Sequence, residues 1–197
     1  MTIQNYNIQN WFSVPILQHQ TSGWAEKLLK PSLKYLDYEK INRHRFYKGR
    51  TTYDTKFNLA KQPEYKTFLK YLKDVAKLYL TNIGFDYEQI SKKFDPYFFT
   101  TELNKGSFQE RHIHNYQLSG IFYLKVPKGS AKIIFHDPIH TREFINWPVL
   151  DHNNPNTFGT ITYEPIVGNL LLWPSWLYHE VPTHTVDDNR IGLVLNL

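Results

Sequence analysis

Three histidines in the C-terminal half have the side-chain chemistry and spacing of a metal site. His112 and His114 are separated by one residue, so on a strand both side chains point to the same face and can bind one ion. His179 would supply a third nitrogen from another strand. Three ligands on one side leave coordination positions open for substrate and oxygen, as in a non-haem iron site. The pattern therefore predicts a redox enzyme.

An arginine and a tyrosine suggest that the same site accepts an anion. Arg190 begins the apolar segment 190–197, where a charge that points inward needs a partner. A bound dicarboxylate would provide that partner through a bidentate pair. Tyr123, within the apolar segment 120–124, would add a hydroxyl donor to the same carboxylate. Taken alone, Arg190 better suits a surface salt bridge and Tyr123 a packed core aromatic residue, but the nearby histidines favour the anion site.

Composition limits the other possibilities. The 197 residues fit one domain that is large enough to bury a core. The chain has no cysteine, which excludes disulfides, thiolate zinc sites and a cysteine nucleophile, so a metal must be held by His, Asp or Glu. The net charge of +5 comes from dispersed lysines, which indicates a solvated basic face rather than a nucleic-acid surface.

Targeting signals are absent from the sequence. It contains no apolar run of eighteen residues and no signal-peptide pattern at its start, so we expect a cytoplasmic protein without a membrane partner. The oligomeric state is left open.

The spacing of apolar residues changes near Asp95-Pro96. Before it, apolar residues recur at three- and four-residue spacing over 65–80, which predicts a helix with Pro63 in its first turn and Gly84 just after its end. A weaker helix is predicted within 23–40, broken or started at Pro31. We therefore expect residues 1–95 to provide helical support and the first strands.

Residues 96–197 read as short strands separated by turns at Lys105-Gly106 and Lys128-Gly129. The expected strands are 97–103, 109–114, 118–126, 131–136, 160–163, 169–174, 179–181 and 190–196. The stretch 137–158 is rich in proline and asparagine and predicts a loop over the site opening. The predicted fold is mainly β with α: a double-stranded β-helix, or jelly-roll, barrel backed by N-terminal helices.

Over about residues 97–197 the chain resembles the iron(II)- and 2-oxoglutarate-dependent dioxygenases, and within them the prolyl-4-hydroxylase-like branch. That family has a histidine, a spacer and an acid, then a strand ending in Tyr-Leu, a glycine-led strand, a distal histidine and a later arginine. The matching residues are His112, His114, Tyr123-Leu124, Gly168-Asn169-Leu170-Leu171-Leu172-Trp173, His179-Glu180-Val181 and Arg190. Leu118-Ser119-Gly120 and Phe135-His136-Asp137-Pro138 look closer still to a small group of such oxygenases in bacteria and phages.

The resemblance implies an enzyme that hydroxylates a C–H bond of a protein side chain or small molecule. It would use Fe(II), O2 and 2-oxoglutarate, and would release succinate and CO2. By this resemblance His112 and His179 bind iron, Arg190 pairs with the distal carboxylate of 2-oxoglutarate, and Tyr123 assists it.

His114 departs from the family pattern, which has Asp or Glu at this position. A neutral imidazole in place of a carboxylate leaves the ferrous site one unit more positive and alters its redox potential and its retention of iron. Glu110 and Asp137 are alternative sources of a carboxylate. A three-histidine iron site is chemically reasonable.

Three other functions share part of this residue pattern. A cupin has a similar histidine pair, with a glycine at the place of Gly106, but its glutamate after the pair is missing here. A nucleic-acid dealkylase has a second arginine where this chain has Asn196. A catalytically inactive or virion-associated jelly-roll binding protein that retains the three histidines is the alternative from a different class, and His114 is the feature that favours it.

Aromatic residues near the expected ligands are candidates for a substrate pocket. They are Trp147, Trp173, Trp176 and Tyr178, with His136 as a possible polar member. Such residues also commonly belong to the core. The sequence does not identify the substrate.

Overall fold

The computed structural model describes residues 7, 13–21, 23–38, 49–139, 147–151 and 154–197. The helices are α1 (Trp24–Tyr38), α2 (Lys66–Asn82) and α3 (Tyr87–Ile90), with short 3-10 turns at Leu59–Lys61, Pro63–Tyr65, Ser91–Lys93 and Pro155–Thr157. The strands are β1 (Leu17–Gln20), β2 (Arg50–Thr51), β3 (Tyr97–Leu103), β4 (Gln109–His112), β5 (Leu118–Lys125), β6 (Ile133–His136), β7 (Thr160–Tyr163), β8 (Asn169–Pro174), β9 (His179–Val181) and β10 (Arg190–Asn196).

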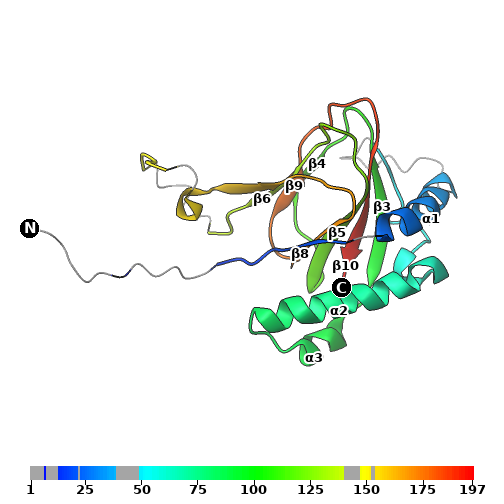
Figure 1. Cartoon of the computed structure of the whole chain (residues 1–197), viewed down its shortest axis with the longest axis horizontal. Helices are drawn as coiled ribbons and strands as arrows, with labels where there is room; N and C mark the ends of the chain where they lie inside the picture. Colours follow the sequence, from blue (N-terminus) through cyan, green and yellow to red (C-terminus); the bar gives the residue numbers. More distant parts are fainter. Residues whose placement is uncertain (1–6, 8–12, 22, 39–48, 140–146, 152–153) are drawn as a thin grey trace, which may run out of the picture.

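These strands form two antiparallel sheets. The larger has the order β1-β8-β5-β10-β3-β2 and the smaller has the order β4-β9-β6-β7. Together with the helices they confirm the predicted mainly-β jelly-roll fold, although over the described residues the two sheets do not close into a continuous barrel. In Figure 1 the hairpin formed by β6 and β7 projects away from the helices.

Alternation along the central strands divides the interior into two cores. On β10, Leu193 and Leu195 pack in one core with residues of α1 and α2 such as Leu28 and Phe68. On β5 and β8, Tyr123 and residues that share its face pack against the smaller sheet in a second core. Because a strand residue and its neighbour point to opposite faces, one sheet both supports the helices and lines the space between the sheets.

Helix α2 has the predicted apolar face. Its buried residues Phe68, Leu72, Val75, Ala76, Tyr79 and Leu80 recur at helical spacing. Pro63 occupies the first position of the 3-10 turn that precedes the helix, and Gly84 follows it with a φ of 87°. Figure 1 shows α2 lying across one side of the strands. The helix and its predicted end before Gly84 are confirmed, whereas Pro63 lies in a separate 3-10 turn and the helix begins at Lys66.

Helix α1 corrects one expectation, because it continues through Pro31 instead of breaking or starting there. A proline inside a helix costs about 3 kcal/mol, since it removes a hydrogen bond and crowds the preceding turn. Buried contacts on both sides of the proline oppose this cost. Leu28 is buried before it, and after it the Ser32 hydroxyl lies 2.8 Å from the hydroxyl of Tyr65.

Five predicted strands have the observed bounds, namely β3, β7, β8, β9 and β10. The strand predicted over 109–114 ends two residues early, at His112. The strands predicted over 118–126 and 131–136 are also shorter. β1 and β2 lie within residues 1–95, where the first strands were expected but no bounds were predicted. Both are short edge strands, of four and two residues, so they carry little local pattern.

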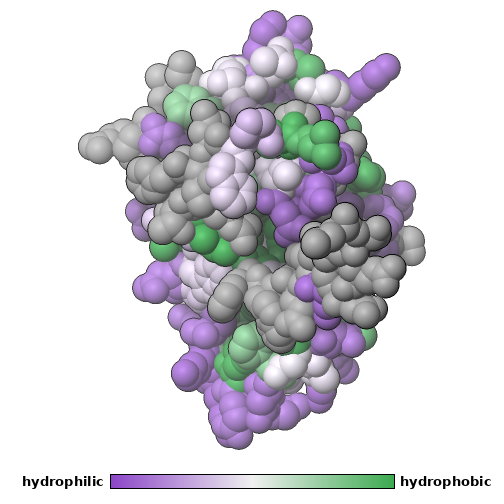
Figure 2. Space-filling model, turned by 90° about the vertical axis from the view of Figure 1, so that its left-hand side faces the viewer, coloured by the Kyte–Doolittle hydropathy of each residue, from purple (hydrophilic) through white to green (hydrophobic). Residues whose placement is uncertain are grey.

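On the side shown in Figure 2, the hydrophobic residues among those that the structure describes form separate patches between hydrophilic ones. The stretch 137–158, expected to be a loop over the site opening, contains residues 140–146 and 152–153, which lie outside the described residues. Its described part includes the turn Pro155–Thr157. Across the described helices, none is long and apolar enough to cross a membrane.

Candidate metal centre

The three candidate ligands meet between the two sheets. His112 is the last residue of β4 and lies directly opposite His179, the first residue of β9. His114 follows two residues after the end of β4. One ring nitrogen from each of the three lies within 4.8 Å of the others. Among the described residues, no carboxylate belongs to this group.

The position of His114 differs from the sequence-based argument. Since β4 ends at His112, strand alternation does not by itself bring His114 to the same face. Instead the backbone N–H of His114 donates to the carbonyl of Ser175 at 3.0 Å, and its ring contacts Asn196 at the end of β10. Contacts between distant segments therefore place this histidine in the group.

Each of the three rings has its Nδ1 atom beside an oxygen. In His112 this oxygen is the carbonyl of Glu110 at 2.7 Å, and in His179 it is the carbonyl of Leu177 at 2.9 Å. A carbonyl oxygen only accepts, so Nδ1 carries the proton in both rings and Nε2 keeps a lone pair. In His114 the neighbour is Oδ1 of Asn196, at 2.7 Å.

This arrangement suits a cation. The Nε2 atoms of His112 and His114 are 3.1 Å apart. When Nδ1 holds the proton in both rings, two lone pairs face each other at this distance, which is unfavourable unless a positive ion lies close to both. Imidazole nitrogen is a good ligand for iron, and hydrogen bonds to the second nitrogen orient such ligands. The donor set fits Fe(II).

Burial keeps these rings in the neutral, metal-binding form. It lowers the pKa of His112, and it lowers the pKa of His114 to about 4. The pKa of His179 falls well below its usual value, mainly by burial and also because His112 and His114 are close. A neutral histidine needs no deprotonation before it binds a metal ion.

Aromatic side chains surround the buried face of His179. The rings of Trp173 and Phe135 have centroids 5.0 Å and 5.9 Å from the His179 ring. Trp173 is only 1% exposed, and its indole Nε1 has no hydrogen-bond partner within the described part of the chain. Trp173 thus forms part of the wall behind the histidines and directs a buried donor into this region.

Arg190 and Tyr123 lie together on the face of the larger sheet that lines the intersheet space. The Arg190 guanidinium carbon is 5.5 Å from the centroid of the Tyr123 ring, and both residues are at most 2% exposed. The Tyr123 hydroxyl has no hydrogen-bond partner among the described residues. Burial raises the pKa of Tyr123 although Arg190 lowers it, so the hydroxyl stays protonated and able to donate.

The inner surroundings of Arg190 are fixed by a chain of hydrogen bonds. Its Nη1 atom donates to the carbonyl of Ala131. The N–H of Ala131 donates to Nδ1 of His184 at 3.3 Å, and the other nitrogen of that ring donates to the carbonyl of Asp188 at 2.9 Å. His184 thereby links the turn that precedes Arg190 to the segment before β6 that contacts the Arg190 side chain.

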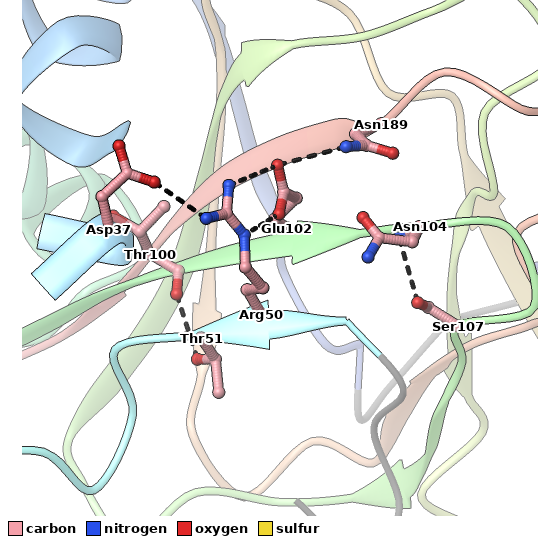
Figure 3. Close-up of polar contacts among 8 residues, drawn as sticks. All are labelled: Asp37, Arg50, Thr51, Thr100, Glu102, Asn104, Ser107 and Asn189. Carbon is pink, nitrogen blue, oxygen red and sulfur yellow. Dashed lines mark hydrogen bonds and ion pairs between the residues drawn. The ribbon is translucent and has the colours of Figure 1, made fainter. Parts of the chain in front are cut away.

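On the other face of the sheet, Glu102 holds the same turn (Figure 3). It is 4% exposed and accepts from Arg50 through two nitrogens and from Asn189 Nδ2 at 3.2 Å. Arg50 also donates to Asp37 at 2.8 Å, beside the end of α1. Since Asn189 immediately precedes Arg190, this network connects the helical layer to the start of β10.

The remaining candidates lie outside the three-histidine group. His136 has its Nε2 atom 3.6 Å from the Glu180 carboxylate, and the register of β6 and β9 puts this pair on the face opposite Phe135 and His179. Trp176 and Trp147 are 53% and 77% exposed. The Tyr178 ring lies 4.8 Å from the Arg111 guanidinium. The carboxylates considered as alternatives, those of Glu110 and Asp137, are not members of the group.

Sequence reasoning missed four residues that arrange the site: Ser119, Ser175, His184 and Asn196. A weak signal existed for Asn196, because it has the same strand parity as Arg190 and therefore faces the same side. Ser119 had the same weak signal, because it shares the strand parity of Tyr123 on β5, whereas Ser175 and His184 have no local pattern that separates them from ordinary polar residues.

Solved structures share this fold at low sequence identity. A prolyl-4-hydroxylase from Pseudomonas putida is 16% identical over 93% of this chain and 92% of its own, with a TM-score of 0.62. HygX from Streptomyces hygroscopicus, solved with nickel and 2-oxoglutarate, is 12% identical over 92% and 82%, with a TM-score of 0.58. A Trichoplax adhaerens prolyl hydroxylase, in complex with a peptide fragment of hypoxia inducible factor, is 15% identical over 92% and 82%, with a TM-score of 0.55.

The family is shown by sequence. No curated protein sequence matches the chain significantly. The sequence model of the 2OG-Fe(II) oxygenases, however, matches residues 98–196, which is half of the chain and contains all three histidines, Tyr123 and Arg190. This match agrees with the fold and with the three-histidine group, and the chain belongs to the 2OG-Fe(II) oxygenase family.

Proposed function

We propose that His112, His114 and His179 bind the iron through their Nε2 atoms. The observation that carries this proposal is the meeting of three neutral imidazoles whose Nδ1 atoms all face oxygen acceptors. Bound iron supplies the activation of oxygen that side chains alone do not provide. The three histidines would hold the ion, and the aromatic side chains packed against His179 would shield it on that side.

Arg190 and Tyr123 would bind the distal carboxylate of 2-oxoglutarate. The guanidinium supplies a positive charge with paired donors, and the protonated Tyr123 hydroxyl supplies one more. Support comes from the Tyr123 hydroxyl itself, because a buried donor without a partner costs about 1–3 kcal/mol. A carboxylate at this place would accept from it and remove that cost.

Trp173 would supply a further donor on the histidine side. Its Nε1–H is buried without a partner among the described residues, and its ring packs against His179. An oxygen of the bound cosubstrate or of the substrate is the acceptor that this donor lacks. Trp173 therefore belongs to the wall of the reaction space rather than to an open aromatic rim.

We further propose that the enzyme hydroxylates a C–H bond of a protein side chain or a small molecule, with release of succinate and CO2. Support comes from proteins of this fold that bind molecules of both classes, since one neighbour was solved with a peptide fragment and HygX with hygromycin B. Ile113 and Trp176 are 47% and 53% exposed and adjoin ligand-bearing segments. With Tyr178 they would contact the substrate at the entrance, and His136 is the polar candidate there.

The organisation and surroundings of the protein are also proposals. We propose one domain over residues 1–197, supported by the core that joins α1 and α2 to the larger sheet. We propose that the enzyme works in the cytoplasm, with host cytoplasm as the location if a phage encodes it, and that nucleic acid is not its substrate.

Succinate release tests the function. Protein loaded anaerobically with Fe(II) is mixed with 2-oxoglutarate and oxygen, and succinate is measured with and without candidate substrates. Wild type should release succinate, and His179→Ala should not. A protein that binds one divalent ion and 2-oxoglutarate but never forms succinate would instead support the alternative, a jelly-roll binding protein that retains a metal site.

A further inference from the structure

A buried polar network lies behind His114, at the end of β10. Asn196 is 2% exposed, and Ser119 and Ser175 are fully buried. Oδ1 of Asn196 accepts from Ser119 Oγ at 2.9 Å and lies 2.7 Å from Nδ1 of His114. The hydroxyls of Ser119 and Ser175 are 2.8 Å apart, and the Ser175 carbonyl accepts the N–H of His114.

In this structure the Asn196 amide has its oxygen toward His114. Oδ1 of Asn196 accepts from the Ser119 hydroxyl and lies beside Nδ1 of His114, so one oxygen joins both neighbours. Because Ser119 uses its single hydroxyl proton on Oδ1, the proton between the two serines comes from Ser175. The donation from Ser119 thus supports the orientation in which Oδ1, rather than Nδ2, faces His114.

The direction of this amide decides which nitrogen of His114 is free. When Oδ1 faces the ring, Nδ1 must donate and Nε2 presents a lone pair. With Nδ2 facing the ring, Nδ1 would accept and Nε2 would carry the proton. That proton would then donate to Nε2 of His112, which is 3.1 Å away, and both metal-binding nitrogens would be consumed.

The tautomers of His112 and His179 do not depend on the orientation of a side chain. Each has its Nδ1 atom beside a backbone carbonyl two residues earlier, and a carbonyl oxygen has only one role. His114 is the one member of the group whose partner is a side chain able either to donate or to accept. Its state therefore depends on how that side chain is held.

We propose that Asn196 is a positioning residue that selects the Nδ1–H tautomer of His114 and so presents Nε2 as the third metal-binding nitrogen. This rests on the proposed metal role of the three histidines. Asn196 does not touch the metal; it acts through His114, and Ser119 acts through Asn196. The network explains how a histidine serves at the position where the resemblance leads one to expect a carboxylate.

The test compares four variants by zinc affinity, with zinc as a diamagnetic probe. Asn196→Leu keeps the branched shape and the number of heavy atoms of the side chain but removes both hydrogen-bonding groups. It should weaken zinc binding about 10- to 100-fold, the usual effect of losing a partner of a metal ligand. Ser119→Ala should weaken it roughly 2- to 12-fold. Asn196→Asp can only accept at Nδ1, so it should bind zinc at least as tightly as wild type.

Asn169→Leu is the matched control. Asn169 is also fully buried, lies on β8 and by strand alternation faces the same side of the larger sheet as Trp173. The same substitution there should leave zinc affinity unchanged. Thermal unfolding of all four variants separates loss of stability from loss of affinity.

A second readout reports the tautomer directly. Proton–nitrogen spectra of histidine-labelled, metal-free protein at a pH where the rings are neutral show which nitrogen carries the proton. His114→Ala identifies the His114 signals. Wild type and Asn196→Asp should show Nδ1–H for His114, whereas Asn196→Leu should show an increased share of Nε2–H. A residue that only fills space would leave this ratio unchanged.

The outcomes separate this inference from the proposed metal centre. Wild type that fails to bind zinc overturns both. Zinc binding that Asn196→Leu leaves unchanged, together with an unchanged His114 tautomer, overturns the role of Asn196 alone. If Asn196→Leu does not fold, Ser119→Ala decides, and an unchanged affinity and tautomer in that variant count against the proposal.

Discussion

The two ends of β10 contribute to the candidate site in different ways. At its last residue, Asn196, the side chain joins a network that orients His114, a proposed metal ligand. At its first residue, Arg190, a buried cation lies beside a tyrosine hydroxyl that has no hydrogen-bond partner among the described residues. Near Asn196, which we call the metal end, the Nδ1 atom of each of the three histidines has an oxygen partner. Near Arg190, the Tyr123 hydroxyl has none among the described residues.

This difference shows which groups orient the side chains at each end of β10. The histidines are oriented by the protein before any ion binds, because carbonyl and amide oxygens fix their Nδ1 atoms. The Arg190 end is held by Ala131, His184 and Glu102, and beside it the Tyr123 hydroxyl has no hydrogen-bond partner among the described residues. We expect the metal end to be insensitive to changes around Arg190, and the following predictions test that separation.

The largest effect should come from removing a metal ligand. His112→Ala or His179→Ala should abolish tight binding of one divalent ion, because each supplies a nitrogen to the same group. Anaerobic calorimetric titration with Fe(II) measures the loss. His19→Ala, which removes an exposed histidine on β1, is the control and should bind as wild type does. Unchanged affinity in both ligand variants would rule out this metal site.

Removing Arg190 should act on the cosubstrate but not on the metal. Arg190→Ala should weaken binding of 2-oxoglutarate by about 2–4 kcal/mol, the cost of losing one partner of a desolvated charge pair. This corresponds to roughly 30- to 900-fold in the dissociation constant. Calorimetry on metal-loaded protein measures it.

Lys105→Ala is the control for that measurement, because Lys105 pairs with Asp187 close to the same turn but is exposed. Its 2-oxoglutarate affinity should stay at the wild-type value. An Arg190→Ala protein that loses metal affinity to the same extent as 2-oxoglutarate affinity would mean that the two ends are not separate.

The network behind Arg190 should matter for stability. Arg50→Met leaves the nearly buried Glu102 carboxylate without its main partner, so the free energy of unfolding should fall by about 1–3 kcal/mol. Denaturant unfolding measures this change, and the double variant Arg50→Met/Glu102→Gln should recover part of the loss. Zinc affinity should not change. A double variant less stable than Arg50→Met would contradict the account of a charge left without its partner.

The smallest effect should come from the Tyr123 hydroxyl. Tyr123→Phe keeps the ring in the core and removes one donor, so 2-oxoglutarate binding should weaken by about 0.5–1.5 kcal/mol. Calorimetry with succinate as a second ligand shows whether the loss follows the distal carboxylate, which both molecules possess. Equal binding of both ligands by wild type and Tyr123→Phe would place the carboxylate elsewhere.

Local patterns were sufficient where a segment is strongly periodic. Five strands and helix α2 were predicted with their observed bounds or nearly so, because alternating or three-to-four spacing reflects the face that each element buries. The same reasoning brought together His112, His179, Arg190 and Tyr123 as candidates. These residues belong to strands, and a strand position determines the face on which a side chain lies.

Only the tertiary structure decided the features that depend on distant contacts. β1 and β2 exist because the edges of β8 and β3 pair with them, and α1 passes Pro31 because packing on both sides outweighs the cost of the proline. His114 lies beyond its strand and is placed by Ser175 and Asn196, which are 61 and 82 residues away in sequence. A sequence reveals the face of a periodic element, but hydrogen bonds between segments this far apart arise only when the sheets pack together.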